Sequence, residues 1–193
     1  MLFTWTRRSL LTAMGASALS LVLDAEGRAA NAPIKPKGAV ILTIAGDIIH
    51  TNRDAFDSKR DGFMKHHEIE FKRAFAFDIA MLEDYPMTQI KCQPPQYSSS
   101  VTFQGPLLRD VMKSLGAEGA AIQTRALDGF AVDLTPEQIA AKDWVLATRA
   151  DGKPFGVGDK GPVWLIHTPS AVKVSEEEEK NWPWALFYIQ INK

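Results

Sequence analysis

The sequence predicts a globular α+β domain in which strands outnumber helices. Of its 193 residues, 46% are hydrophobic and 23% are charged, which is the composition of an ordinary globular protein. Short apolar runs rich in β-branched residues recur between residues 39 and 191, as buried strands require. Apolar residues at helical spacing separate some of these runs. This mixed order of strand and helix signals is typical of the α+β class.

The charge balance excludes a nucleic acid as the partner. Lys and Arg total 22, Asp and Glu total 23, and the net charge is -1. A protein that binds nucleic acid or anionic lipid through its charge needs a positive field, which this composition does not supply. No linker rich in Pro, Gly or Ser divides residues 33–193, so we expect a single domain there.

Residues 1–32 resemble a cleavable export signal of the twin-arginine type. The pair Arg7–Arg8 precedes an apolar stretch, and small residues follow that stretch. Asp24 closes the stretch before it reaches the roughly 20 strongly apolar residues of a membrane anchor, which is the alternative. Cleavage after Ala29 or Ala32 would release a periplasmic protein that is not inserted in the membrane.

Three helices are predicted. Apolar residues at helical spacing predict an amphipathic helix over residues 70–83. Residues 105–115 form a second helix, which Gly-Pro opens because proline is tolerated at the first helical position, and Gly116 is placed to end it. A third, short helix begins at Thr135, whose hydroxyl pairs with Gln138 in a capping box.

Seven strands are predicted from apolar or alternating runs. The turn at Asp128-Gly129 joins two of them as a hairpin. The single cysteine, Cys92, lies in another, so the chain can form no internal disulfide. A polar loop is expected over residues 47–62. The predicted strands span residues 39–44, 88–93, 122–126, 130–134, 144–147, 163–166 and 186–191.

A resemblance to a known family rests on Val101–Asp110, Val145–Pro154 and Asp159–Trp164, together with Trp184 and the strand after it. In order and spacing these segments are similar to the molybdopterin-binding domain of the sulfite oxidase family. The resemblance covers residues 85–193. It implies a mixed, barrel-like β-sheet fold of the sulfite oxidase type with a few short helices.

Two departures from the family pattern bear on function. Enzymes of this family hold molybdenum through a cysteine in a loop, whereas Cys92 lies in a predicted strand. Lys160 stands where the family usually has histidine. The lysine version resembles short, exported, stand-alone members that bind a pterin without metal. The resemblance implies action through a partner, such as a membrane receptor that controls cyclic dinucleotide synthesis.

Three aromatic residues are candidates for stacking on such a ligand. A pterin is a flat, polar bicycle, so its site needs an aromatic plane and polar groups along the ring edge. Tyr97, Trp182 and Trp184 lie in proline-containing stretches without regular structure, where rings are less committed to the core. The alternative for each of them is packing under a loop.

Charged residues near predicted loops supply candidate contacts to the ring edge. Arg149 follows a predicted strand and Lys160 follows a glycine-rich stretch, so either cation could bind a carbonyl oxygen or the phosphate of a molybdopterin. Asp159 could accept hydrogen bonds from an amino group. No metal site is predicted, because His66 and His67 project in different directions and no third ligand stands at useful spacing.

These observations lead to three hypotheses. The first is a periplasmic, noncatalytic protein that binds a pterin, of the tetrahydropterin type, and signals through a partner. The partner must then bind the occupied and empty forms with different free energy. The second is an oxidoreductase that depends on the molybdenum cofactor, or a subunit of one, with Cys92 as metal ligand. The third is a scaffold that has lost its ligand.

Overall fold

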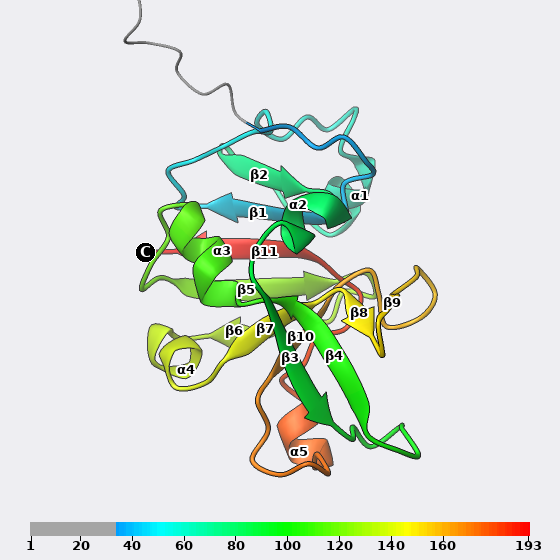
Figure 1. Cartoon of the computed structure of the whole chain (residues 1–193). Helices are drawn as coiled ribbons and strands as arrows, with labels where there is room; N and C mark the ends of the chain where they lie inside the picture. Colours follow the sequence, from blue (N-terminus) through cyan, green and yellow to red (C-terminus); the bar gives the residue numbers. More distant parts are fainter. Residues whose placement is uncertain (1–33) are drawn as a thin grey trace, which may run out of the picture. The chain divides into compact units, whose positions relative to one another are not determined.

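Two strands from opposite ends of the described chain form the centre of the largest sheet (Figure 1). The computed structural model describes residues 34–193, so the expected export signal lies outside the described residues. β1 (Leu42–Gly46) pairs in parallel with β11 (Leu186–Asn192), and Thr43 lies opposite Tyr188. This pairing joins the first and last strands of the described chain in one sheet.

Three further strands complete this sheet, whose order is β2-β1-β11-β5-β6. β2 (Ala74–Phe77) is antiparallel to β1, and β5 (Ala121–Ala126) is antiparallel to β11. β6 (Asp133–Leu134) pairs with β5 across the turn that contains Gly129, which has a φ of 89°. The predicted hairpin is therefore confirmed, and glycine supplies the left-handed conformation that its turn needs.

Six strands form two smaller sheets. β3 (Met87–Cys92) and β4 (Val101–Pro106) make a long hairpin, which β8 (Arg149–Ala150) and β9 (Lys153–Pro154) extend to four strands. β7 (Trp144–Ala147) pairs with β10 (Trp164–His167). Within residues 34–193 none of the sheets closes into a barrel, so the α+β class is confirmed and the barrel-like expectation is corrected.

β4 and β7 belong to different sheets and approach each other closely. A Cβ at Gly105 of β4 would collide with the backbone carbonyl of Leu146 in β7. Only glycine allows this approach. The hairpin β3–β4 is thereby packed directly on the strand pair β7–β10.

Short helices lie between these strands in the chain. The predicted capping box is present at α4, where Thr135 Oγ1 accepts from Gln138 N and Thr135 N donates to Gln138 Oε1. Ser175 caps α5 by accepting from the backbone N of Glu178 at 3.2 Å. The helices within residues 34–193 are α1 (Gly62–His66), α2 (Ile79–Glu83), α3 (Leu108–Ser114), α4 (Pro136–Ala140) and α5 (Glu176–Glu179).

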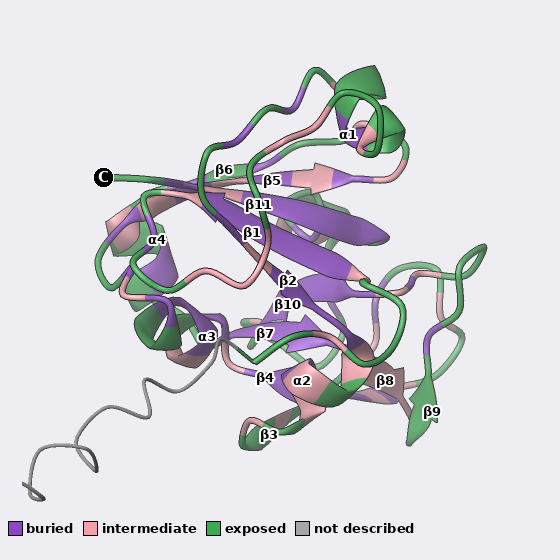
Figure 2. Ribbon diagram, turned by 90° about the horizontal axis from the view of Figure 1, so that it is seen from above, coloured by how far each residue is buried: buried purple, intermediate pink, exposed green. Residues whose placement is uncertain are grey.

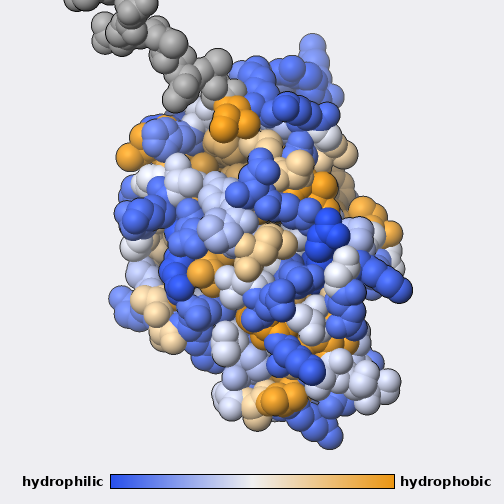
Figure 3. All heavy atoms as spheres, in the orientation of Figure 1, coloured by the Kyte–Doolittle hydropathy of each residue, from blue (hydrophilic) through white to orange (hydrophobic). Residues whose placement is uncertain are grey.

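Burial is concentrated on the central strands, and the loops and outer helix faces are exposed (Figure 2). The described residues, 34–193, form one compact unit. The surface in Figure 3 is mostly hydrophilic, with apolar atoms in small groups. Within residues 34–193, no helix is long and apolar enough to cross a membrane. Removal of the central apolar side chains from water is the main source of stability for such a unit.

The predicted helix over residues 70–83 is wrong in its first half. Residues 74–77 form β2, in which Ala74, Ala76 and Phe77 are buried. Only the second half is helical, and α2 begins after Asp78, whose carboxylate accepts from Met81 N at 2.9 Å. Pairing with β1 determines the conformation of residues 74–77, because tertiary context overrides a local apolar periodicity.

Three other boundaries differ from the prediction. Pro106 ends β4 instead of opening a helix, and α3 begins two residues later, although Gly116, with a φ of 71°, follows its end as expected. The predicted strand 130–134 shortens to β6, which leaves Phe130 exposed in the turn. The predicted strand 39–44 lies further along the chain, because β1 spans Leu42–Gly46, whereas the predicted loop 47–62 ends at α1 as expected.

Asp78 fixes the start of α2 to the segment that leads into β1. Its side chain is only 3% exposed. Its Oδ2 accepts from the backbone N of Lys37 at 2.7 Å and of Gly38 at 2.8 Å. The bonds from Gly38 and Met81 are the main causes that lower the pKa of this carboxyl. One carboxylate therefore satisfies three backbone donors from two segments of the chain.

Replacing this carboxylate tests its structural role. Asp78→Ala leaves three backbone N–H groups without their acceptor, so the free energy of unfolding should fall by roughly 2–3 kcal/mol in urea denaturation. Asp84→Ala, at the exposed end of the same helix, is the matched control and should change it by less than about 0.5 kcal/mol. Equal losses in the two variants would contradict the capping role.

Candidate ligand pocket

The loop before β10 and the loop after α5 are held together by hydrogen bonds. The backbone N of Ala185 donates to the carbonyl of Lys160 at 2.9 Å. The indole Nε1 of Trp164, at the start of β10, donates to the carbonyl of Trp182 at 3.0 Å. Because Trp184 lies between Trp182 and Ala185 in the chain, these bonds also fix its position. Residues far apart in the sequence are thus gathered at one end of β10.

An aromatic cluster forms around Trp164, which is fully buried. The ring of Tyr97 stacks on it at 6.3 Å between centroids, and the ring of Trp182 meets it edge to face at 6.4 Å. Lys160 Nζ lies 5.3 Å from the centre of the Trp164 ring and 4.8 Å from that of Trp184. Four of the six predicted ligand contacts therefore meet at this cluster.

A pocket of about 470 Å³ opens beside the cluster. Phe130 and Trp184 line it with rings that are 47% and 39% exposed, and Trp182, 1% exposed, lines it as well. This volume is within the range of roughly 300–1,000 Å³ that is typical of ligand pockets. The polar lining consists of Gln96, Asp128, Glu176, Glu179 and Lys180, so carboxylates outnumber cations.

Two buried polar atoms of the lining residues have no hydrogen-bond partner among residues 34–193. They are a donor, Trp182 Nε1, and an acceptor, Glu179 Oε1. The other carboxylate oxygen of Glu179 accepts from Gln96 Nε2 at 2.8 Å. A buried polar atom without a partner costs about 1–3 kcal/mol. A bound molecule that supplied the missing partners would recover this cost, which makes the pair a marker of a ligand position.

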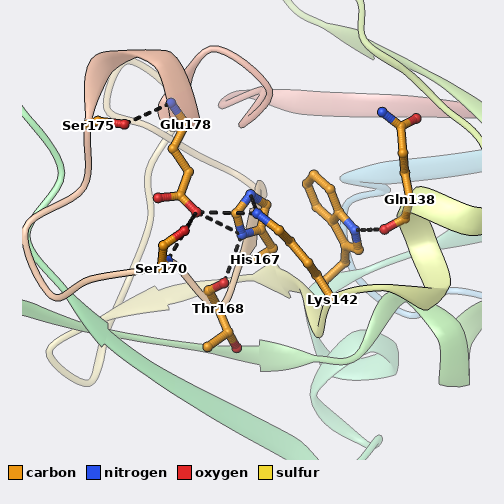
Figure 4. A network of polar contacts seen from close by, with 8 residues as sticks. Gln138, Lys142, His167, Thr168, Ser170, Ser175 and Glu178 are labelled. Carbon is orange, nitrogen blue, oxygen red and sulfur yellow. Dashed lines mark hydrogen bonds and ion pairs between the residues drawn. The ribbon is translucent and has the colours of Figure 1, made fainter.

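A polar network anchors α5, the helix that carries Glu179 (Figure 4). The Oε1 atom of Glu178 accepts from the backbone N and the Oγ of Ser170 at 3.1 and 3.2 Å, and from Lys142 Nζ at 3.3 Å. Burial by itself would raise the pKa of Glu178, but these hydrogen bonds outweigh it and lower the pKa. The anchored Glu178 fixes the position of the neighbouring Glu179.

His167 connects this network to the aromatic cluster. Its ring edges meet Trp182 at 5.1 Å and Trp144 at 4.7 Å between centroids. Its Nδ1 lies 2.9 Å from the carbonyl of Thr168 and its Nε2 lies 3.2 Å from Lys142 Nζ. The neutral tautomer with hydrogen on Nδ1 fits both contacts, since a hydrogen on Nε2 would face the ammonium group. Burial, and then the charge of Lys142, lower the pKa of His167.

Carboxylates surround Tyr97 on the other side of the cluster. Burial raises the pKa of its phenol, and the charges of Asp159, Glu179 and Asp151 raise it further. Asp159, a predicted contact, is exposed and reaches the cluster only through this electrostatic effect. The phenol of Tyr97 therefore lies in an acidic environment.

Arg149 lies outside the pocket and is not one of its lining residues. Its guanidinium forms a two-point ion pair with Glu83, with Nε 2.8 Å from Oε1 and Nη2 2.9 Å from Oε2. A third donor, Nη1, contacts the carbonyl of Gly152 at 3.1 Å. Hydrogen bonding to Arg149 lowers the pKa of Glu83. The arginine thus joins β8 to α2, a structural function that its sequence position did not reveal.

Cys92 does not fit the role of a metal ligand. It is fully buried at the end of β3, opposite Val101, and burial with the nearby Glu178 charge raises the pKa of its thiol to about 11. Metal binding needs the thiolate, which this environment disfavours. Within residues 34–193, no cluster of three or more His, Cys, Asp or Glu side chains could hold a metal ion.

In two other hollows some of the charged groups form ion pairs. A pocket of about 380 Å³ between α3 and α4 includes Arg109, which forms an ion pair with Asp143. An apolar hollow of about 470 Å³ beside β1 includes Arg53 and Asp61, which pair with each other at 2.6 Å. The pocket at Trp184 differs from both because its lining residues include polar atoms that still need partners.

Of the residues that line the pocket, only Trp182 and Trp184 are among the predicted contacts; the six others are Gln96, Asp128, Phe130, Glu176, Glu179 and Lys180. Glu179 lies in a run of four glutamates that predicts only a solvated segment, and Gln96 is 83 positions away from it. The sequence predicts a strand that includes Phe130, but β6 begins only at Asp133, and Phe130 lines the pocket instead. The signal that could have indicated Glu179 is its place just before Trp182 and Trp184.

Comparisons with known proteins add no relative: neither a scan against protein-family models nor a search of curated proteins finds a match for this chain. The description of the site therefore depends on its geometry.

The lowered pKa of His167 predicts a loss of stability in acid. The unfolded chain takes up a proton on this residue near pH 6.5, whereas the native state resists it to lower pH, so the free energy of unfolding should fall as the pH falls below 6.5. His167→Gln should remove this part of the pH dependence in urea denaturation at pH 7.5 and 5.5.

The second histidine with a lowered pKa, His67, is the control for this experiment. Its pKa is lowered by burial and by the neighbouring His66. His67→Gln should remove only the part of the pH dependence that His67 contributes, and the part contributed by His167 should remain. An unchanged pH dependence in His167→Gln would refute the neutral state assigned to this residue.

Proposed function

We propose that this protein binds a pterin in the pocket at Trp184 without catalysing a reaction. One observation carries the proposal. The lining residues of a single 470 Å³ pocket combine two exposed aromatic rings with a buried donor and a buried acceptor that lack partners in the described chain. A flat heterocycle with polar edges matches this combination, because its faces stack on the rings and its edge supplies the missing hydrogen bonds.

The charge of the pocket favours a pterin without phosphate, of the tetrahydropterin type, over a molybdopterin. Three carboxylates line it, namely Asp128, Glu176 and Glu179, against the single ammonium group of Lys180. Lys180 is itself paired with Glu177. A phosphate would meet repulsion here, whereas an uncharged ring with several N–H groups would find acceptors. Lys160 is not among the lining residues, because its ammonium group lies over the rings of Trp164 and Trp184.

We extend the proposal to the fold of the sulfite oxidase type. The segments that carry the resemblance form β4 with the start of α3, β7 with β8 and β9, and the start of β10. They pack on one another, as the contact between Gly105 and Leu146 illustrates. Their mutual packing supports a common origin for the motifs, and the pterin pocket would then lie at Trp184, the part of the resemblance that lines it.

Signalling through a periplasmic partner is the second part of the proposal. The pocket rim includes α5, whose exposed glutamates give a partner a charged surface beside the ligand. A partner can sense the ligand only if it binds the occupied and empty forms with different free energy. The periplasmic domain of a membrane receptor that controls cyclic dinucleotide synthesis is the partner that the family resemblance suggests.

The alternative, a molybdenum cofactor oxidoreductase, is disfavoured by Cys92. Its thiol is fully buried and has a raised pKa of about 11, so it is a poor source of the thiolate that would bind molybdenum. Packing as a small apolar residue accounts for its environment in β3. We derive no catalytic step through this residue.

Analysis of the natural ligand separates these functions. Protein isolated from its native cells should release a pterin on denaturation, detected by fluorescence, without stoichiometric molybdenum in elemental mass spectrometry. Cys92→Ala should retain the pterin and lose about 1 kcal/mol of stability through altered packing. Molybdenum in a one-to-one ratio with the pterin, lost in Cys92→Ala, would establish the oxidoreductase instead.

Removing an exposed ring should weaken binding. Trp184→Ala should lower the affinity for tetrahydropterin by about 1–2 kcal/mol, or five- to thirtyfold, in calorimetric titration, because a stacking surface is lost. Phe63→Ala is the matched control, since Phe63 is an aromatic residue of similar exposure that lines the hollow beside β1. Equal affinities of the wild type and Trp184→Ala would exclude Trp184 from the site.

A further inference from the structure

The turn from Glu179 to Trp182 brings a carboxylate and an indole N–H together at the pocket. Glu179 is the last residue of α5, and its backbone carbonyl accepts from the N of Trp182 at 2.8 Å, so the carboxylate and the Trp182 indole belong to one tight turn. Gln96 Nε2 holds one carboxylate oxygen at 2.8 Å. Within the described residues, the other oxygen and Trp182 Nε1 have no partner, and both residues line the pocket.

The turn therefore offers two acceptors and one donor. Each carboxylate oxygen has room for more than one hydrogen bond, so the bond from Gln96 does not prevent Glu179 from accepting at both oxygens. The indole Nε1 can only donate. Glu179 is only partly buried, and rotation of its side chain can turn the carboxylate into the pocket. Trp182 is only 1% exposed, so its side chain is held by the residues packed around it.

We infer that Glu179 and Trp182 recognise the 2-amino-4-oxo edge of a pteridine, and that Glu179 excludes 2,4-dioxo pteridines. This inference depends on the proposed function. The edge of a pterin presents the 2-amino group, N3–H and the 4-oxo group, which are two donors followed by an acceptor. That order is complementary to the two carboxylate oxygens and the indole N–H.

A 2,4-dioxo pteridine lacks this complementarity. Its corresponding edge presents an oxygen, N3–H and a second oxygen. One carboxylate oxygen of Glu179 would then face the 2-oxo group, and two acceptors would be forced together in a pocket that already carries negative charge. A site that hydrogen-bonds a donor discriminates strongly against an analogue that lacks it, because its own buried polar group is left unpaired.

The test compares two commercially available bicycles, pterin (2-amino-4-oxopteridine) and lumazine (2,4-dioxopteridine), in calorimetric titrations of the purified protein. The wild type should bind pterin at least tenfold more tightly than lumazine. Glu179→Gln replaces one acceptor with an amide donor, which fits the dioxo edge, so this preference should disappear or reverse. Thermal unfolding of the variant should remain cooperative, because the substitution is isosteric at a partly exposed position.

A charge-matched control separates recognition from electrostatics. Glu176→Gln removes the same charge from another lining residue of the pocket and should keep the preference for pterin. If both variants lose the preference equally, or if the wild type binds the two compounds with equal affinity, the inference about Glu179 is overturned and the proposed function stands. If the wild type binds neither these compounds nor tetrahydropterin, the proposed function itself fails.

Discussion

The hydrogen bond from the Trp164 indole to the carbonyl of Trp182 is the contact on which the pocket depends. It joins the first residue of β10 to the loop between α5 and β11, and both of its groups are buried. Breaking it would leave a buried donor unsatisfied and would free the loop that positions Trp184. Lys160 and Ala185 add a backbone bond beside it. The ligand pocket is thus an outcome of how the last strand is attached to the core.

The second constraint is the distribution of charge. Some cations of the domain form ion pairs, such as Arg149 with Glu83 and Arg53 with Asp61. At the pocket, three lining carboxylates stand against the single ammonium group of Lys180. A protein with a net charge of only -1 therefore has a local acidic field. This local field, not the overall composition, determines which ligands the pocket can accept.

Parts of this arrangement could be predicted from the sequence because the signals were local. The capping box at Thr135, the turn at Gly129 and the apolar runs of β7 and β11 depend on neighbouring residues, and all of them are confirmed. β2 could not be predicted, because the spacing of Phe71, Phe75 and Ile79 also suits a helix, and only pairing with β1 resolves it.

The candidate site was predictable to a similar degree. The motif segments and the irregular stretches around Trp182 and Trp184 indicated a common site, since those stretches contain proline and lack strand or helix patterns. Glu179 and Gln96 could not be paired in advance, because a contact across 83 positions depends on the meeting of the β3–β4 loop with α5. The ion pair of Arg149 could not be predicted for the same reason, because its partner Glu83 precedes it by 66 positions.

The small size of α5 has a thermodynamic consequence. One turn of four residues is not stable by itself, and the adjacent carboxylates of Glu176–Glu179 repel one another. Its order depends on the Ser175 cap and on the anchor at Glu178. Ligand binding in the pocket and folding of this turn are therefore linked equilibria. The free energy of ligand binding at Glu179 would stabilise the folded form of this acidic surface turn. Ligand binding inside the pocket would in this way change how rigid the turn is on the outer surface.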